Sequence, residues 1–314
     1  METSTSAWLT ESKAYPFVLK AGPKPQPGEG EVLIRNAAVA IEVGAGVTRF
    51  KRGQPVIAHC NSLLTQNPAN SAFQHYTILT EKLVAEIPAE LGFEQAVVLP
   101  LAITTACAGL YGSEYLNLPL PSLASEKKKK TGQTILIWGG VSSVGATAIQ
   151  LASCSGLQVI TTASTANHDF VKSLGADAVF DYKSPTVVDA IAKAVLDTDL
   201  VGVYDAIGEA PSFAAITALA DQLQRPLNTA AVLPCDQPTP RCIPKYVRAV
   251  SIIEQPDEHI AQWIWGQFLP QALTSGQFQA KPDLYIVGNG LKDVQYGLDV
   301  QKKGVSAKKG VISL

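Results

Sequence analysis

The fold of this chain is decided by the stretch Thr134-Ile135-Leu136-Ile137-Trp138-Gly139-Gly140-Val141-Ser142-Ser143-Val144-Gly145. Its first half is apolar and partly β-branched, as in a buried strand, and its second half is a turn of small residues. A helical stretch follows, and residues 158–162 form a second strand-like run. Strand, glycine-rich turn, helix and strand in this order predict a dinucleotide-binding unit. The turn presents backbone N–H groups to the pyrophosphate, and the helix N-terminus adds partial positive charge.

The glycine fingerprint G-x-G-x-x-G is present in altered form, as Gly140-x-Ser142-x-x-Gly145. A serine at the middle position still leaves room for the phosphates and offers them a hydroxyl group. An ordinary strand–helix turn would not need so many small residues in succession. We therefore expect Gly140, Ser142 and Gly145 to contact the cofactor.

The end of the second strand indicates which dinucleotide binds. An NAD site usually has an acidic residue there, about twenty residues after the glycines, for the ribose 2′-hydroxyl. Here the segment is Ala163-Ser164-Thr165-Ala166-Asn167-His168, and Asp169 comes too late for the acidic role. Ser164 and Asn167 can donate hydrogen bonds to a 2′-phosphate, which a carboxylate would repel. The sequence therefore favours NADPH.

Composition limits the class of protein. The chain has 314 residues, of which 46% are apolar and 17% charged, as expected for a globular enzyme with two domains. A net charge of −2 predicts neither a nucleic-acid partner nor an anionic membrane surface. The first residues lack the features of a signal peptide, and no run of about eighteen apolar residues occurs, so we expect a cytoplasmic protein. The five cysteines are too scattered for a disulfide framework or a zinc ribbon.

The rest of the chain divides into a β-rich first part and an α/β second part. In the first part, strand-like segments occupy 31–40, 53–58 and 73–79, and a small-residue helix runs from Pro100 to Leu110. In the second part, strands are predicted at 178–182, 200–205, just before Leu233 and at 251–253, with helices at 187–195 and 259–274. This alternation predicts an α/β fold with a Rossmann doubly wound parallel sheet. Between the parts, Lys127 to Lys130 predict a solvated loop, because no aromatic residue interleaves them.

Three further motifs, together with the β-rich start and the glycine turn, carry a resemblance to a known family. They are Pro100-Leu101-Ala102-Ile103-Thr104-Thr105-Ala106, Leu174-Gly175-Ala176-Asp177-Ala178-Val179-Phe180-Asp181-Tyr182 and Lys303-Gly304-Val305-Ser306-Ala307-Lys308. Over nearly its whole length the chain resembles the zinc-free medium-chain dehydrogenase/reductase superfamily, and within it the stand-alone (trans-acting) enoyl reductases of fungal polyketide biosynthesis. The resemblance implies a GroES-like β lobe at 1–115, to which 270–314 return, and a Rossmann NADPH-binding domain at 116–269.

The resemblance also implies roles for individual residues. Ser143 and Val144 join the pyrophosphate turn, and Ser164 and Asn167 form the 2′-phosphate segment. Further expected cofactor contacts are Tyr182 on the adenosine side, Leu233 beside the nicotinamide, and Val305 and Ser306 near the C-terminus. Thr105 would place a hydroxyl near the nicotinamide, and Leu101, Ile252 and Ile253 would line the acyl pocket. For Leu101 and Ile252 the alternative interpretation is that they belong to the hydrophobic core and do not line a pocket.

One departure from the family pattern affects the first part of the chain. In the family, an Asn-Pro-x-Asp turn, a helical segment and a Gly-x-Asp-x-x-Gly strand follow the strand that here ends at Ile41. In this chain Ile41 runs directly into Glu42-Val43-Gly44. We therefore expect a shortened β lobe that lacks part of the nicotinamide pocket. A non-catalytic NADPH-binding protein is accordingly one alternative prediction.

The absence of metal-ligand motifs from the sequence indicates which reaction the site suits. No Gly-His-Glu motif or cysteine cluster accompanies His59-Cys60, so no metal site is predicted. A metal-free nicotinamide site suits hydride transfer to an α,β-unsaturated thioester or ketone, with Tyr76, Tyr111 or water as proton donor. The expected substrate is a small-molecule or carrier-bound enoyl group, with a polyketide synthase as a partner by resemblance. A quinone or alkenal reductase is the alternative enzyme prediction. The oligomeric state, monomer or homodimer, is left open by the sequence.

Overall fold

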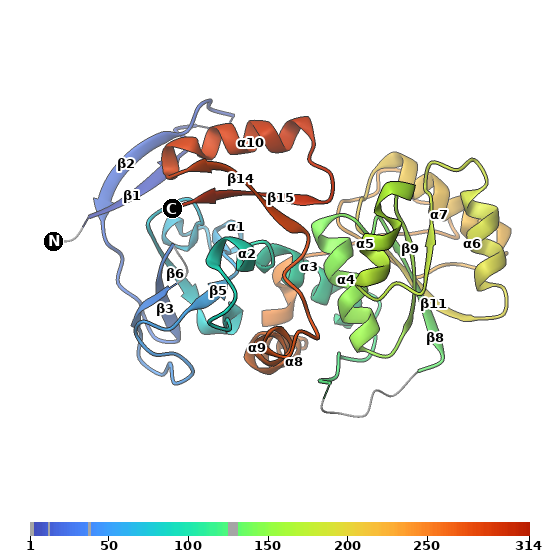
Figure 1. Cartoon of the computed structure of the whole chain (residues 1–314), viewed down its shortest axis with the longest axis horizontal. Coiled ribbons are helices and arrows are strands. Elements are labelled where there is room, and N and C mark those ends of the chain that lie inside the picture. The colour runs from blue at the N-terminus through green and yellow to red at the C-terminus, as the bar shows by residue number, and fades with distance from the viewer. Residues whose placement is uncertain (1–2, 12, 37–38, 125–130) are drawn as a thin grey trace.

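The computed structural model describes residues 3–11, 13–36, 39–124 and 131–314 (Figure 1). The β-rich first part and the C-terminal elements β14, α10 and β15 lie on one side of Figure 1, and the α/β part lies on the other. Between them runs α3 (Pro100–Tyr111), close to the helical run that contains α8 and α9. The predicted lysine run 127–130 lies outside the described residues.

Six parallel strands form the sheet of the α/β part, in the order β10-β9-β8-β11-β12-β13. They are β8 (Gln133–Trp138), β9 (Gln158–Thr162), β10 (Ala178–Phe180), β11 (Asp199–Asp205), β12 (Thr229–Ala231) and β13 (Lys245–Tyr246). The first of these strands in the chain, β8, lies inside the sheet, with β9 and β11 on its two sides. The strand order therefore reverses at β8, and ligands of such sheets bind at the carboxyl ends beside this point. The predicted doubly wound parallel sheet is confirmed.

Helices cover both faces of this sheet. Ile135 and Ile137 of β8 pack in an apolar cluster with α4 (Ser143–Cys154), α5 (His168–Ser173) and α3. Leu136 and Trp138, which alternate with them, pack with α6 (Val187–Val195) and α7 (Ala210–Gln222). A strand buried on both faces has no polar side, which explains the unbroken apolar run of β8.

The β-rich part consists of small antiparallel sheets. They are β1 (Thr3–Trp8) with β2 (Val18–Pro23), β4 (Val39–Val43) with β3 (Glu31–Arg35) and β6 (Tyr76–Thr80), and β5 (Val56–Ala58) with β7 (Val84–Glu86). Short helices α1 (Ser62–Thr65), η1 (Pro68–Asn70), η2 (Glu81–Leu83) and α2 (Phe93–Ala96) connect them. The chain returns to this part through β14 (Asp283–Asn289), η6 (Leu291–Asp293), α10 (Val294–Lys303) and β15 (Lys308–Ser313).

Two expectations from the sequence are wrong. Residues 31–40 are not one strand, because β3 ends at Arg35 and β4 runs antiparallel beside it. The Asn36 side chain donates to the Ala72 carbonyl at 2.8 Å and the Thr77 hydroxyl at 2.9 Å, which fixes the chain as it leaves β3. Residues 251–253 belong to a 3₁₀ helix, η4 (Ala249–Ile253), that packs against α3, and the sheet strand there is β13. A run of three apolar residues has no periodicity that separates the two structures.

The predicted helix over 259–274 is confirmed and contains a π turn. The run consists of α8 (Glu258–Trp263), η5 (Ile264–Phe268) and α9 (Leu269–Thr274) without a break. The Leu269 N–H bonds to the Ile264 carbonyl, and Pro270 has no N–H, so the Trp265 carbonyl lacks a helical donor. Arg49 supplies one through Nη2 at 3.0 Å. The 269/270 boundary proposed from the sequence falls inside this run.

The same guanidinium ties the helix to β7. Arg49 Nη2 also donates to the Val84 carbonyl at 3.0 Å, and Nη1 donates to the Glu81 carbonyl at 3.0 Å. Burial lowers the pKa of Arg49 from its usual value, but the group stays charged at any physiological pH. One side chain of the β-rich part therefore completes the hydrogen bonding of a helix in the second part.

Helix α3 is the central core helix. The stretch Phe93–Tyr111 is long and apolar enough to cross a membrane by length and composition alone, but 72% of its most apolar window is buried inside the protein. It contacts α4 and η4. None of the five cysteines, all within the described residues, forms a disulfide.

Candidate active site

The residues predicted to bind cofactor follow the carboxyl ends of neighbouring parallel strands. The glycine turn follows β8, Ser164 follows β9, Tyr182 follows β10, and Leu233 follows β12. Because all these strands point the same way, the segments after them meet at one edge of the sheet, beside the reversal at β8. The fold thus brings together residues that are far apart in the sequence.

The glycine turn is built as the fingerprint predicts. Gly139 has φ of +82°, which a side chain would strain, and its N–H donates to Thr162 Oγ1 at 2.9 Å. Ser142 is the N-cap of α4, where its Oγ accepts from the Gly145 N–H at 3.0 Å. The Ser142 hydroxyl hydrogen is not used in this bond and can be donated to a phosphate. Ser142, Ser143 and Val144 are all partly exposed.

Two of the glycines are needed for close packing under the turn. A Cβ on Gly145 would lie 2.2 Å from the Gly139 carbonyl oxygen, and a Cβ on Gly140 would lie 2.3 Å from Thr161 Oγ1. The start of α4 therefore lies directly against the end of β8. A cradle of this kind fits a dinucleotide pyrophosphate.

The segment after β9 brings the two predicted 2′-phosphate residues together. Asn167 Nδ2 donates to Ser164 Oγ at 3.0 Å, in and beside the turn η3 (Thr165–Asn167). Both side chains are partly exposed. Their remaining hydrogens can be donated to an anion.

The sequence reasoning missed Asp181, which lies beside this segment. Its Oδ2 accepts from Thr165 Oγ1 at 2.6 Å, and its Oδ1 accepts from the Lys183 N–H at 2.9 Å. The Thr165 hydroxyl bond, first, and the Lys183 N–H bond lower the pKa of Asp181. A signal was available: β10 runs parallel beside β9, so a residue after β10 lies close to one after β9. The exposed Lys183 brings a positive charge to the same place.

A buried carboxylate supports the segment around Leu233. Asp205, at the end of β11, accepts from the N–H groups of Ile207 and Gly208 at 3.0 Å each and from Ser212 Oγ at 2.6 Å. Gly208 lies against Leu233, since its Cβ would be 2.8 Å from Leu233 Cβ. Leu233 itself is 47% exposed. Asp205 therefore sets where Leu233 is presented at the sheet edge.

The residues predicted for catalysis and the acyl pocket lie on α3 and η4. Thr105 is mostly buried, and its hydroxyl donates to the Leu101 carbonyl at 2.7 Å. Leu101 is 54% exposed and Ile253 is partly exposed, so both offer apolar surface. Ile252 is fully buried in the cluster beneath α3, where its side chain presents no surface to a ligand.

The structure also separates the two tyrosines considered as proton donors. Tyr111 is buried at the end of α3, and its hydroxyl lies 3.0 Å from Ser155 Oγ. Burial raises the pKa of Tyr111 well above its usual value. Tyr76 is partly exposed on β6, with Lys24 Nζ 5.3 Å from its ring centroid. Tyr111 is thus shielded from any substrate.

Val305 and Ser306 lie in the loop between α10 and β15. Val305 helps to line a surface pocket of about 420 Å³ with Tyr285, Tyr296, Val300, Lys303, Gly304 and Lys308. Ser306 is exposed. The loop is drawn at the end of the C-terminal ribbon that faces the α/β part in Figure 1.

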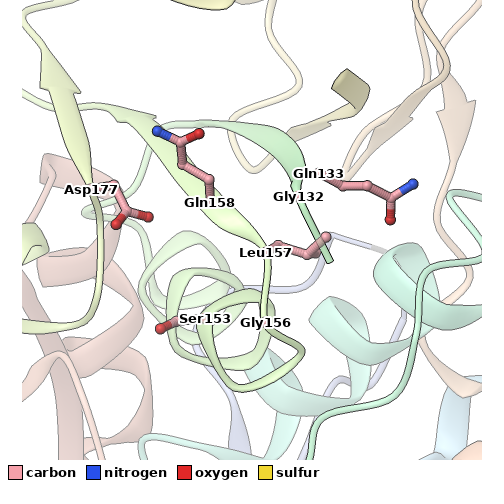
Figure 2. A pocket seen from close by; sticks show the side chains of 7 residues that line it. All are labelled: Gly132, Gln133, Ser153, Gly156, Leu157, Gln158 and Asp177. Carbon is pink, nitrogen blue, oxygen red and sulfur yellow. The ribbon is translucent and has the colours of Figure 1, made fainter. Parts of the chain in front are cut away.

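A second pocket of about 420 Å³ lies elsewhere. Figure 2 shows Gln133, Leu157, Gln158 and Asp177 around it, and these residues are at or before the amino ends of β8, β9 and β10. It therefore lies at the opposite end of the strands from the glycine turn. No predicted site residue lines it. Over the described ranges, no three or more His, Cys, Asp or Glu side chains are grouped to hold a metal ion.

Several known proteins are similar to this chain in sequence or in fold. The family model described as zinc-binding dehydrogenase matches residues 143–223. Trans-enoyl reductase himH from Aspergillus japonicus is 44% identical over 282 residues, which cover 88% of this chain and 79% of that protein. The crystal structure of CurK enoyl reductase covers 99% of both chains with a TM-score of 0.73 at 15% identity, a likeness of fold alone.

A third comparison concerns length. Dehydrogenase pigH from Monascus ruber is 34% identical over 372 aligned positions that cover 100% of both chains. Because this chain has 314 residues, dozens of positions in that relative have no counterpart here.

Proposed function

Because this chain belongs to the medium-chain dehydrogenase/reductase superfamily, we propose that it is an NADPH-dependent reductase of activated carbon–carbon double bonds. We place it with the trans-acting enoyl reductases of polyketide biosynthesis, acting in the cytoplasm on a small-molecule or carrier-bound enoyl group. The observation that carries the proposal is the sheet edge where the glycine turn, the Ser164–Asn167 pair and Leu233 meet. The relative named trans-enoyl reductase supports the substrate class.

The residues present fit the cofactor. The glycine turn would hold the pyrophosphate, because a side chain on Gly140 or Gly145 would fill the space against β8 and β9. The Ser142 hydroxyl accepts from the Gly145 N–H and keeps its own hydrogen for donation to a phosphate oxygen. Ser164 and Asn167 would bind the 2′-phosphate, with Lys183 adding positive charge and Asp181 opposing it.

When bound, NADPH supplies a hydride to the β-carbon of the substrate. The protein itself positions the reacting groups and stabilises the charge that develops during the reaction. Asp205 holds the loop on which Leu233 presents an apolar surface, and Leu101 offers a second apolar surface on α3. The electron pair of the double bond moves to the carbonyl oxygen during the reaction, and hydrogen-bond donors aimed at that oxygen lower the barrier.

A second candidate function follows from the chain's length. The positions of pigH without a counterpart here favour a protein that binds NADPH without using it. Small errors in the placement of the substrate relative to the cofactor slow the reaction strongly, since a shift of about 1 Å can reduce the rate on the order of a hundredfold.

One experiment separates these functions. The quenching of tryptophan fluorescence is titrated with NADPH and with NADH, and crotonyl thioester is then added while NADPH absorbance is followed. The enoyl reductase proposal predicts tighter binding of NADPH and its oxidation on addition of the thioester. Binding without oxidation of NADPH by any enoyl thioester or enone supports the non-catalytic function. Oxidation by a free quinone only supports the quinone reductase alternative.

A further inference from the structure

The surface pocket that Val305 helps to line belongs to the C-terminal segment. Its walls come from β14, α10, β15 and the loop between α10 and β15, and it measures about 420 Å³. The glycine turn and the Ser164–Asn167 segment, both described in full, contribute nothing to this lining. Val305 is also a predicted cofactor contact, so the pocket borders the predicted cofactor site. Small-molecule sites commonly have volumes in this range.

The residues that line the pocket come together from one helix and two strands. Tyr296, Val300 and Lys303 follow one another at intervals of four and three residues, which places them on one side of α10. Tyr285 lies on β14 and Lys308 on β15, and these two strands pair in parallel. The pocket is therefore a product of the C-terminal segment alone, held open by regular elements.

The pocket carries positive charge, and no acidic residue lines it among those described. Lys303 and Lys308 are both exposed, and neither forms an ion pair with a carboxylate of the described residues. Asp283 lies opposite Lys308 in the ladder, but its Oδ1 is paired with Lys281 Nζ at 2.6 Å. Two ammonium groups without a counter-charge at one pocket favour an anionic ligand, and lysines are common ligands of phosphate.

Two exposed tyrosines lie beside these lysines. Tyr285 is 45% exposed and Tyr296 is 59% exposed. Lys308 Nζ lies 5.9 Å from the centroid of the Tyr285 ring, a contact that keeps the ammonium group at the pocket. The ring faces offer apolar contact, and the hydroxyl groups offer hydrogen bonds. The pocket therefore fits a phosphate group joined to an arm that has both apolar and amide groups.

We propose that this pocket binds the phosphorylated pantetheine arm of the enoyl thioester, with Lys303 and Lys308 on the phosphate and Tyr285 and Tyr296 along the arm. This role rests on the proposed function. Val305 joins the pocket to the predicted cofactor site, where the thioester end of the arm must lie. Coenzyme A and the prosthetic group of an acyl carrier protein both contain this arm, so the pocket recognises chemistry that the two sources share.

Matched thioesters test the contribution of the phosphate. Crotonyl-pantetheine and crotonyl-phosphopantetheine differ only in this group. We expect the wild type to have a KM about tenfold lower for the phosphorylated thioester, because charge-assisted hydrogen bonds form with the phosphate. The double variant Lys303→Ala/Lys308→Ala should lose this advantage. Lys302→Ala is the matched control and should keep it, since Lys302 is exposed in the same last turn of α10 and does not line the pocket. Equal KM values for the two thioesters in the wild type would overturn the proposal.

Binding without turnover separates the pocket from the proposed function. Phosphopantetheine alone is titrated by calorimetry into protein saturated with NADP⁺. Saturable binding that Lys303→Ala/Lys308→Ala abolishes supports the pocket, even if no thioester is reduced. Reduction of crotonyl-pantetheine without binding of phosphopantetheine overturns the pocket and leaves the proposed function intact. A raised Kd for NADPH in the double variant would assign the two lysines to the cofactor, which also overturns the proposal.

The two sources of the arm are distinguished with crotonyl-CoA and with an acyl carrier protein loaded with a crotonyl group. We expect the KM for both to rise about tenfold in Lys303→Ala/Lys308→Ala, since both contain the phosphate. A rise for one of them alone identifies that source as the ligand of the pocket. A rise for neither shows that the pocket does not bind the arm.

Discussion

Gly145 shows how much depends on one hydrogen atom at the residue scale. In Gly145→Ala the new methyl group would lie 2.2 Å from the Gly139 carbonyl oxygen, so the turn must move away from α4. We expect the affinity for NADPH to fall at least about tenfold, because the backbone donors lose their placement. Gly92→Ala is the control, since φ there is −61° and no atom lies within 4 Å of the added Cβ. Equal affinities in a fluorescence titration would contradict the assigned role of the turn.

His59 also makes stability depend on pH. A histidine in an unfolded chain has a pKa of about 6.5, whereas burial lowers the pKa of His59 in the folded protein to about 4. Between these values only the unfolded chain binds the proton. The contribution of His59 to the free energy of unfolding therefore falls as pH drops from about 6.5 to about 4, by a few kcal/mol in all.

Urea unfolding at pH 7, 6 and 5 measures this dependence. His59→Phe should remove part of the decline in stability below pH 6.5, while His75→Phe, at an exposed position of the same part, should keep it. The prediction is wrong if the wild type and His59→Phe lose stability in parallel.

At the scale of elements, the loop after β11 depends on Asp205. Asp205→Ala would leave the N–H groups of Ile207 and Gly208 without their acceptor, and the Ser212 hydroxyl would keep only the Glu209 carbonyl, at 2.9 Å. We expect the free energy of unfolding to fall by about 3 kcal/mol and the KM for NADPH to rise, because Gly208 supports Leu233. Ser212→Ala removes one of the three bonds and should cost about 1 kcal/mol with little change in KM. If Asp205→Ala has the same KM for NADPH as the wild type, this loop has no role in cofactor binding.

Helices and strands were predictable where the hydrophobic pattern is long or is bounded by turn-forming residues. The helix Val187–Val195 and the strands β8 and β9 have the periods and boundaries that the sequence indicates. The break in 31–40 was not predictable, because it depends on Asn36 bonding to residues some forty positions later. Short apolar runs such as 251–253 carry too little periodicity to choose between strand and helix.

The candidate site shows the same limit. The glycine turn is local, so sequence spacing locates it, whereas Asp181 and the pocket around Lys308 acquire their surroundings only through neighbouring strands. The burial of His59 is likewise a property of the folded state, and no spacing rule could have singled it out.

At the scale of the whole molecule, Arg49 joins the two parts. Arg49→Met would leave the carbonyls of Glu81, Val84 and Trp265 without this donor. We expect a loss of about 2–4 kcal/mol in the free energy of unfolding, with NADPH affinity within about twofold, because none of these groups is at the glycine turn. Arg52→Met, at an exposed position nearby, should have little effect. Urea unfolding followed by NADPH titration tests both statements, and unchanged stability in Arg49→Met would contradict the joining role.

The bond between Arg49 and Trp265 has a consequence for the order in which the protein is made. Its two residues are 216 positions apart, so during synthesis the guanidinium emerges long before the carbonyl that it will satisfy. The Arg49 bonds to the Glu81 and Val84 carbonyls can form within the first part, whereas its bond to Trp265 forms only after translation has passed η5. A product that terminates before α8 never gains this bond, and the newly made first part alone lacks one of the contacts that complete the native state.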